Sequence, residues 1–149
     1  GGTLRLLLHL PATQARAAAV RVGDTLLLPT SATQAARPLV EAWYRQQAQA
    51  HVAARIAHFA PLVGRAPARI SIRAQRTRWG SCSGRGTISI NWRLLLASPE
   101  VLDYVIVHEL CHLLQANHSA RFWREVARVM PEYARHQQQL REFGRQLVL

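Results

Sequence analysis

The feature that most constrains this chain is an apolar segment that contains three polar side chains. Residues 105–114 are all apolar except His108, Glu109 and His112. A helix of this composition packs against a core, and each polar group then needs a partner inside the protein. His108 and His112 share one helical face, about 5.4 Å apart along the axis. One metal ion bound by both imidazoles meets this need. The alternative is two core histidines bonded to protein groups, with Glu109 on the surface.

The HExxH spacing of these residues is typical of a hydrolytic zinc site. Zinc binds imidazole nitrogens at about 2.0–2.1 Å, and two histidines one helical turn apart can both reach one ion at that distance. Glu109 projects beside the pair and not toward the ion, where it can take a proton from a zinc-bound water. The pattern therefore predicts one zinc ion per chain, with Glu109 as the general base.

A catalytic zinc needs a third protein ligand, and His118 is the nearest candidate. On an unbroken helix His118 would lie about 9 Å beyond His112 and some 120° around the axis, out of reach of the same ion. The helix must therefore end between them, and the chain must turn back within residues 115–117. Asn117 suits this turn because asparagine tolerates the left-handed conformation that closes many helices. Ser119 can cap the next helix at once.

Metzincins space their third histidine in the same way, but they place glycine where this chain has Gln115, so we expect a different turn here. Two downstream carboxylates, Glu125 and Glu132, are alternative third ligands, because some zincins use a glutamate at this point. We expect His118 to complete the ligand set, since Ser119 would begin a new helix directly after it and hold it in the turn.

Periodicity and turn residues divide the rest of the chain into short elements. A serine, a proline and an acid at residues 98–100 predict that the motif helix begins at Pro99 and runs to about Ala116. The run GSCSGRG at 80–86 predicts a loop between two alternating strands. The expected elements are strands within about 4–28, a long helix at about 38–59 ended by Pro61, Gly64 and Pro67, a hairpin at about 69–92, and helices over 99–149. We expect an α+β fold, a small antiparallel sheet packed against helices, in one domain of residues 1–149.

The charge of the chain is strongly positive and unevenly distributed. The formal charge is +11, and all 19 basic residues are arginine. Residues 42–99 contain no aspartate or glutamate, and a field of this sign attracts nucleic acid or acidic protein surfaces. A GC-rich genome would explain arginine in place of lysine, but it explains the missing acids less well. The sequence therefore suggests weak nucleic-acid binding through region 42–99.

Several classes of protein do not fit this chain. No apolar run is long enough to cross a bilayer, so we expect no membrane association. Residues 4–10 are too short and too interrupted for a signal peptide. Cys82 and Cys111 form no disulfide framework, and neither belongs to a CxxC pair. We expect a cytoplasmic, reducing location.

Several runs of the sequence resemble one family in the same order. They are RTRWGSCS at 76–83, ISINW at 88–92 and HELCHLLQANHSARFW at 108–123. Together they resemble the bacterial YgjP-like metallopeptidase family and are similar, more distantly, to the WLM and SprT/Spartan metalloproteases. The resemblance spans about Arg69 to the C-terminus. It implies a zincin-like fold, metal ligands at His108, His112 and His118, and a catalytic glutamate at Glu109. Because WLM and Spartan proteases cleave proteins crosslinked to DNA, it also draws attention to the basic region.

Four further residues are candidates for substrate or oxyanion contacts. In zincins an edge strand beside the metal pairs with the extended substrate, and the segment 78–83 or the strand at 87–92 could serve here. Arg78 and Asn91 could reach the substrate, and Arg78 could stabilise the oxyanion. The alternative for Arg78 is a structural hydrogen-bond donor. Tyr104 and Tyr133 are possible oxyanion donors.

The function expected from the sequence is zinc-dependent hydrolysis of protein or peptide substrates. In this reaction Glu109 accepts a proton from the metal-activated water and passes it to the leaving amine. The alternative is a nucleic-acid-binding module with a structural or vestigial zinc site. Glu109 argues against that alternative, because a structural site does not need it. A peptidase that acts on nucleic-acid-associated proteins is compatible with both the HExxH residues and the basic region 42–99.

Overall fold

The computed structural model describes residues 5–7, 20–22, 25–27 and 36–147. The chain divides into two compact units, Gly1–Gln47 and Ala48–Leu149. The strands of the first unit are β1 (Arg5–Leu7), β2 (Val20–Val22) and β3 (Thr25–Leu27), in the order β1-β3-β2. β2 pairs with β3 in antiparallel fashion, and β1 pairs with β3 in parallel. These strands fall within the range predicted at about 4–28.

The long helix α1 spans Ala36–Val63 and extends beyond the predicted 38–59 at both ends. Pro61 lies inside its last turn instead of ending it. The helix ends at Gly64, whose φ of +93° is accessible to glycine, and the amide of Gly64 donates to the carbonyl of Ala60 at 2.8 Å. Gly64 is one of the three residues expected to end the helix, whereas the boundary predicted at about residue 59 is wrong by one turn. Proline here removes one hydrogen bond only, close to the end of the helix.

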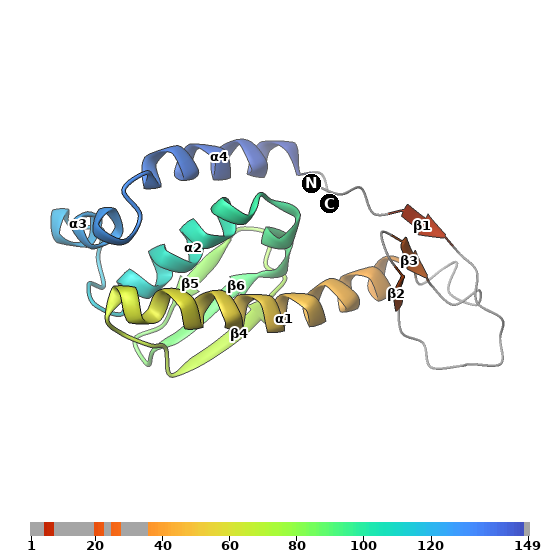
Figure 1. The fold of residues 1–149 in the computed structure, drawn as a ribbon, viewed down its shortest axis with the longest axis horizontal. Coiled ribbons are helices and arrows are strands. Elements are labelled where there is room, and N and C mark those ends of the chain that lie inside the picture. The colour runs from red at the N-terminus through yellow and green to blue at the C-terminus, as the bar shows by residue number, and fades with distance from the viewer. Residues whose placement is uncertain (1–4, 8–19, 23–24, 28–35, 148–149) are drawn as a thin grey trace. The chain divides into compact units, whose positions relative to one another are not determined.

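The second unit contains the sheet of β4 (Arg69–Arg73), β5 (Gly80–Cys82) and β6 (Thr87–Asn91), in the order β4-β6-β5 (Figure 1). β4 runs parallel to β6, and β5 runs antiparallel to it. The prediction of one hairpin over 69–92 in an antiparallel sheet is therefore wrong. The outer strands are joined by a crossover, and residues expected to form a loop supply β5. Alternation of apolar residues indicates which face of a strand is buried, but it does not indicate the strand's direction.

Helices cover the buried face of this sheet. Ile88 and Ile90 of β6 are fully buried in one cluster with apolar residues of α1 and of α2 (Pro99–His112). A 3₁₀ turn, η2 (Trp92–Leu96), connects the sheet to α2. α3 (Ala120–Val129) and α4 (Tyr133–Gln146) follow, and α2 lies between α1 and α4 (Figure 1). The predicted α+β class is confirmed, and α2 with its HExxH residues lies at the centre of the unit.

Arginine side chains tie the helices of the second unit to one another. Arg55 of α1 donates two hydrogen bonds to Asp103 of α2, at 2.8 and 2.9 Å. Arg128 of α3 donates to the carbonyls of Leu62 and Val63, which are the last of α1. The bonds from Arg128 satisfy carbonyls at the end of α1 that have no partner within the helix itself. None of the helices that the structure describes is both long and apolar enough to cross a membrane.

Candidate active site

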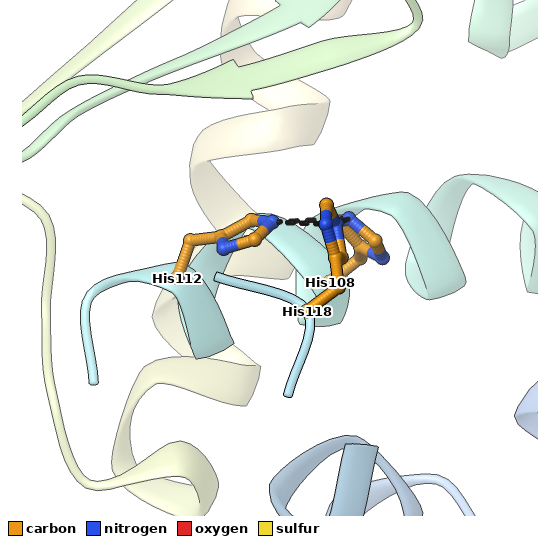
Figure 2. A group of neighbouring side chains, drawn as sticks. All are labelled: His108, His112 and His118. Carbon is orange, nitrogen blue, oxygen red and sulfur yellow. Dashed lines mark hydrogen bonds between the residues drawn. The ribbon is translucent and has the colours of Figure 1, made fainter. Parts of the chain in front are cut away.

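Three histidine side chains converge on one point. The Nε2 atoms of His108 and His112 lie 3.2 Å apart, and the Nε2 atom of His118 lies 3.1 Å from each of them (Figure 2). Tetrahedral zinc with bonds of about 2.0–2.1 Å separates its ligand nitrogens by ~3.3 Å. The three nitrogens therefore already stand at nearly the spacing that one zinc ion needs. Among the described residues this is the group of histidine, cysteine or acidic side chains placed to hold a metal.

The return of His118 to the helix depends on how α2 ends. α2 ends at His112, earlier than predicted, and the amides of Leu113 and Leu114 donate to carbonyls three residues back, at 3.0 Å each. No non-glycine residue in the described ranges has a positive φ, so the left-handed turn predicted at Asn117 is wrong. Shorter hydrogen bonds tighten the last turn instead, and the chain leaves it through ordinary conformations. Ser119 caps α3 as predicted, accepting from the amide of Phe122 at 3.4 Å.

Hydrogen bonds to the other ring nitrogens orient the imidazoles. Nδ1 of His112 lies 3.0 Å from the carbonyl oxygen of Gln115. A carbonyl can only accept, so Nδ1 carries the proton, and in the neutral ring Nε2 has a free lone pair for a metal. Nδ1 of His108 lies 3.5 Å from the hydroxyl of Tyr104.

The protonation of the rings also suits metal binding. Burial, together with the neighbouring His112 and His118, lowers the pKa of His108 to about 4. Burial also lowers the pKa of His112, although backbone hydrogen bonds oppose the shift. These two rings are therefore neutral at neutral pH, which is the form that binds a metal ion.

Two aromatic residues at the start of α3 support the imidazoles. Phe122 is fully buried, stacks on His112 with centroids 4.4 Å apart, and lies 5.0 Å from both His108 and His118. Trp123 stacks on His118 at 5.9 Å. Our sequence reasoning did not identify either residue. The sequence signal that could have identified them is their place in the first turn of the helix after Ser119. This turn must face the metal site if His118 does.

Glu109 lies beside the histidines but outside the ligand group. Its side chain is 6% exposed, and it lines the same cleft as the three imidazoles. Burial raises the pKa of Glu109 to about 7, and the nearby Arg78 opposes this shift. The carboxylate packs against Gly80 of β5, where a side chain would leave no room for it.

The cleft around the histidines has a volume of about 450 Å³. One wall is β5, an edge strand of its sheet, with Gly80, Ser81 and Cys82 lining the cleft. Of the two segments considered as the edge strand beside the metal, the structure selects 78–83. The other one, now β6, is the central strand.

The remaining candidates lie at different distances from the cleft. Arg78 is exposed and lines it, whereas Tyr104 lines an adjoining cavity. Asn91 is buried, and its amide donates to the carbonyls of Gln75 and Arg78, so it braces the loop before β5. Tyr133 stacks on Trp123 at 5.3 Å and lines neither cavity.

The two alternative third ligands lie outside the histidine group. Glu125 is ion-paired with Arg128 and Glu132 with Arg135, and neither acid belongs to the ligand group. Four arginines of the acid-free region line two further hollows. Arg65 and Arg85 line a cavity of about 390 Å³ that shares His112 and Ala116 with the cleft, and Arg69 and Arg73 line a hollow along β4.

Comparisons with known proteins agree with this geometry. A family model described as "YgjP-like, metallopeptidase domain" matches residues 1–143. The crystal structure of the metallopeptidase zymogen abylysin from Pyrococcus abyssi is similar, with a TM-score of 0.55 and 29% identity over 64% of this chain and 94% of that one. The zymogen jannalysin from Methanocaldococcus jannaschii shares the fold, with a TM-score of 0.54 and 19% identity over 61% of this chain and 94% of that one. No curated protein matches the sequence. The zincin-like fold and the peptidase class expected from the sequence are confirmed, and the chain belongs to the YgjP-like metallopeptidase family.

Proposed function

We propose that this protein hydrolyses peptide bonds with one zinc ion held by His108, His112 and His118, and with Glu109 as the general base. The single observation that carries the proposal is the convergence of three Nε2 atoms within 3.2 Å of one another in a cleft that Glu109 also lines. A structural site would have no use for a buried acid that makes no bond to the ligands. The proposal therefore takes precedence over a binding module with a vestigial site.

When bound, zinc would lower the pKa of a water molecule and polarise the carbonyl of the scissile bond. Glu109 would accept the proton of the attacking water and deliver it to the leaving nitrogen. Its position supports both transfers, because it lines the cleft beside the three histidines and packs against Gly80, where a side chain would leave it no room. Burial favours the proton-carrying form, as the raised pKa of about 7 indicates, so the acid can both take up and release a proton near neutrality.

The substrate would bind along β5. This edge strand has one side paired with β6, and its residues line the cleft. An extended peptide can add to such an edge through backbone hydrogen bonds and place one peptide bond beside the histidines. Proteins and peptides in an extended conformation are therefore the proposed substrates.

Arg78 is the proposed oxyanion contact, since it lines the cleft and acts electrostatically on Glu109. Tyr104 would instead orient His108, because its hydroxyl lies 3.5 Å from Nδ1 and not on the Nε2 side. Asn91 would act indirectly, through its hydrogen bond to the carbonyl of Arg78. Tyr133 would act through the ring of Trp123.

A link to nucleic acid is a second candidate feature of the function. It is favoured by Arg65 and Arg85, which line a cavity adjoining the cleft. Guanidinium groups at this place could bring the peptidase to proteins that are bound to nucleic acid.

The proposed function is tested by comparing the zinc-loaded wild type with Glu109→Gln on an unbiased pool of peptides from a protein digest. The wild type should generate new peptide ends, and the variant should keep its zinc but lose activity by several orders of magnitude. Equal turnover by both proteins would remove Glu109 from the mechanism. A wild type that cleaves no peptide would instead support the vestigial site.

A further inference from the structure

A second cavity, of about 300 Å³, adjoins the active-site cleft on the side of Gly80. It shares Arg78, Gly80, His108 and Glu109 with that cleft. Its other walls come from the segment before β5, the middle of α2 and one face of α4. The side chains that form these walls are Trp79, Tyr104, Val105, Gln137, Leu140 and Arg141. A residue of a substrate lying along β5, next to the bond at the metal site, would reach this cavity.

The charge of the cavity is positive at its rim. Arg78 and Arg141 are both exposed, and within residues 37–147 neither forms an ion pair with an acid. Glu109 is the one acid that lines either the cleft or this cavity. Two guanidinium groups from segments 63 positions apart in sequence therefore face a common space in which the carboxylate of Glu109 is the one acidic group. Guanidinium groups bind carboxylates through two parallel hydrogen bonds.

The walls below the rim are apolar and well supported. The ring of Trp79 packs against Phe143 with centroids 5.3 Å apart, and Gly144 allows α4 to approach it, since a side chain there would meet Trp79 at 3.4 Å. Tyr104 is buried, and burial raises its pKa to about 12, so its hydroxyl stays protonated. An apolar wall with donors at the rim fits a side chain with an apolar stem and an anionic end.

We propose that this cavity is a specificity pocket that binds a carboxylate-bearing residue of the substrate next to the scissile bond. The stem of the residue would contact Trp79 and Leu140, and its carboxylate would bind Arg141 and Arg78. This inference rests on the proposed peptidase function and adds the substrate class. The carboxylate belongs to an acidic side chain or to the C-terminus of the substrate, and both have the same chemistry.

Binding is tested first, without turnover. The probes are labelled peptides in which a hydroxamate at one end anchors on the zinc of the wild type, followed by Glu, Gln or Leu. Two series, with the hydroxamate at the N-terminus or at the C-terminus, cover both directions along β5. In one series we expect Glu to bind about tenfold more tightly than Gln at low salt, because a charge-assisted hydrogen bond is stronger than a neutral one. In the same series a free C-terminal carboxylate is compared with its amide, which distinguishes the two sources of the charge.

Variants of α4 supply the controls. Arg141→Ala should abolish the preference for Glu, and Arg141→Glu should reverse it. Arg145→Ala should preserve it, because Arg145 is exposed one turn further along α4 and lines no part of the cavity. Equal binding of Glu and Gln in both series would overturn the proposal. So would a preference that persists in Arg141→Glu.

Peptide hydrolysis and competition by an oligonucleotide distinguish failure of the pocket from failure of the proposed function. Peptides cleaved by the wild type should carry Asp, Glu or the C-terminus at one fixed position beside the new end. Cleavage without this preference removes the pocket and keeps the proposed function. Preferential binding of Glu without any cleavage keeps the pocket and removes the function. A single-stranded oligonucleotide that displaces the probes from the wild type but not from Arg141→Glu, with no preference for Glu, would assign the two arginines to phosphates and overturn the proposal.

Discussion

Gly80 and Glu109 are in contact across the cleft. A β-carbon at Gly80 would lie 2.9 Å from Oε1 of Glu109, closer than real β-carbons approach other atoms, and 3.0 Å from its Cγ. A third close neighbour, the side chain of Val105, would also lie at 3.0 Å. Strand β5, which lines the cleft, therefore approaches α2 as closely as a residue without a side chain allows.

Gly80→Ala should impair catalysis more than metal binding. The added methyl group must displace the carboxylate of Glu109, and a misplacement of about 1 Å can cost up to ~100-fold in rate. We expect kcat to fall about 10- to 100-fold while the zinc content stays near one per chain, as measured by peptide turnover and metal analysis. Gly84→Ala is the matched control, because a side chain at Gly84 would meet nothing within 4 Å. Equal rates for both variants would show that the contact does not position Glu109.

Glu109→Gln should stabilise the metal-free protein at high pH. Burial raises the pKa of Glu109 from 4.5 to about 7, so the folded state binds this proton more tightly than the unfolded state does. The stability of the wild type is therefore reduced as the pH rises from 4.5 to 7, and the cost is complete above 7. We expect the Tm of the variant to exceed that of the wild type at pH 8 by on the order of 5 °C, and the difference to vanish below pH 4.5. Thermal unfolding of the two apo-proteins across this range provides the measurement, and a gain independent of pH would contradict this origin.

His118→Ala should lose the metal. Four-ligand zinc sites bind with about 10–16 kcal/mol, so removal of one ligand costs ~3 kcal/mol, or roughly a hundredfold in Kd. Glu125→Ala and Glu132→Ala should retain wild-type affinity, because both acids are paired with arginines outside the cluster. Competition with a zinc-sensitive dye gives the zinc dissociation constants of the three variants. If Glu125→Ala or Glu132→Ala loses the metal and His118→Ala keeps it, the ligand set is wrong.

Phe122→Leu should weaken metal binding about tenfold. The ring supports all three imidazoles, and groups that orient metal ligands typically contribute this much to affinity. Val126→Ala is the control, since Val126 is equally buried on α3 and makes no ring contact with a histidine. Both variants should lose about 1–2 kcal/mol of unfolding free energy. If the two variants weaken zinc binding equally, Phe122 contributes only to the packing of the core and does not orient the imidazoles.

The arginines of the acid-free region should bind DNA or RNA weakly and without sequence preference. The affinity should fall with salt on a log–log plot by about 0.9 for each duplex phosphate that is neutralised. The slope should flatten in a quadruple variant that replaces Arg65, Arg69, Arg73 and Arg85 by Gln. A control quadruple variant has Gln in place of four exposed residues of α3 and α4, namely Arg121, Arg124, Arg135 and Arg145. No binding at low salt, or equal slopes in both variants, would contradict the prediction.

The local parts of the site could be predicted because they depend on short separations along the chain. His108 and His112 lie four residues apart, and helical geometry alone places them on one face. The need for His118 to return follows from the same geometry, and Ser119 signals the next helix without any knowledge of the fold. The convergence of the three histidines and the neighbouring position of Glu109 could therefore be predicted from residues 108–119.

The tertiary structure decided the neighbours of these residues. Alternation placed Ile88 and Ile90 on a buried face, but the parallel direction of β4 and the place of β5 at an edge of the sheet depend on pairing across a crossover. The contact of Gly80 with Glu109 and the common cavity of Arg78 and Arg141 join segments that are 29 and 63 positions apart. Sequence periodicity determines which side of an element is buried, whereas packing determines what that side meets, because contacts between distant segments depend on the whole fold and not on local spacing.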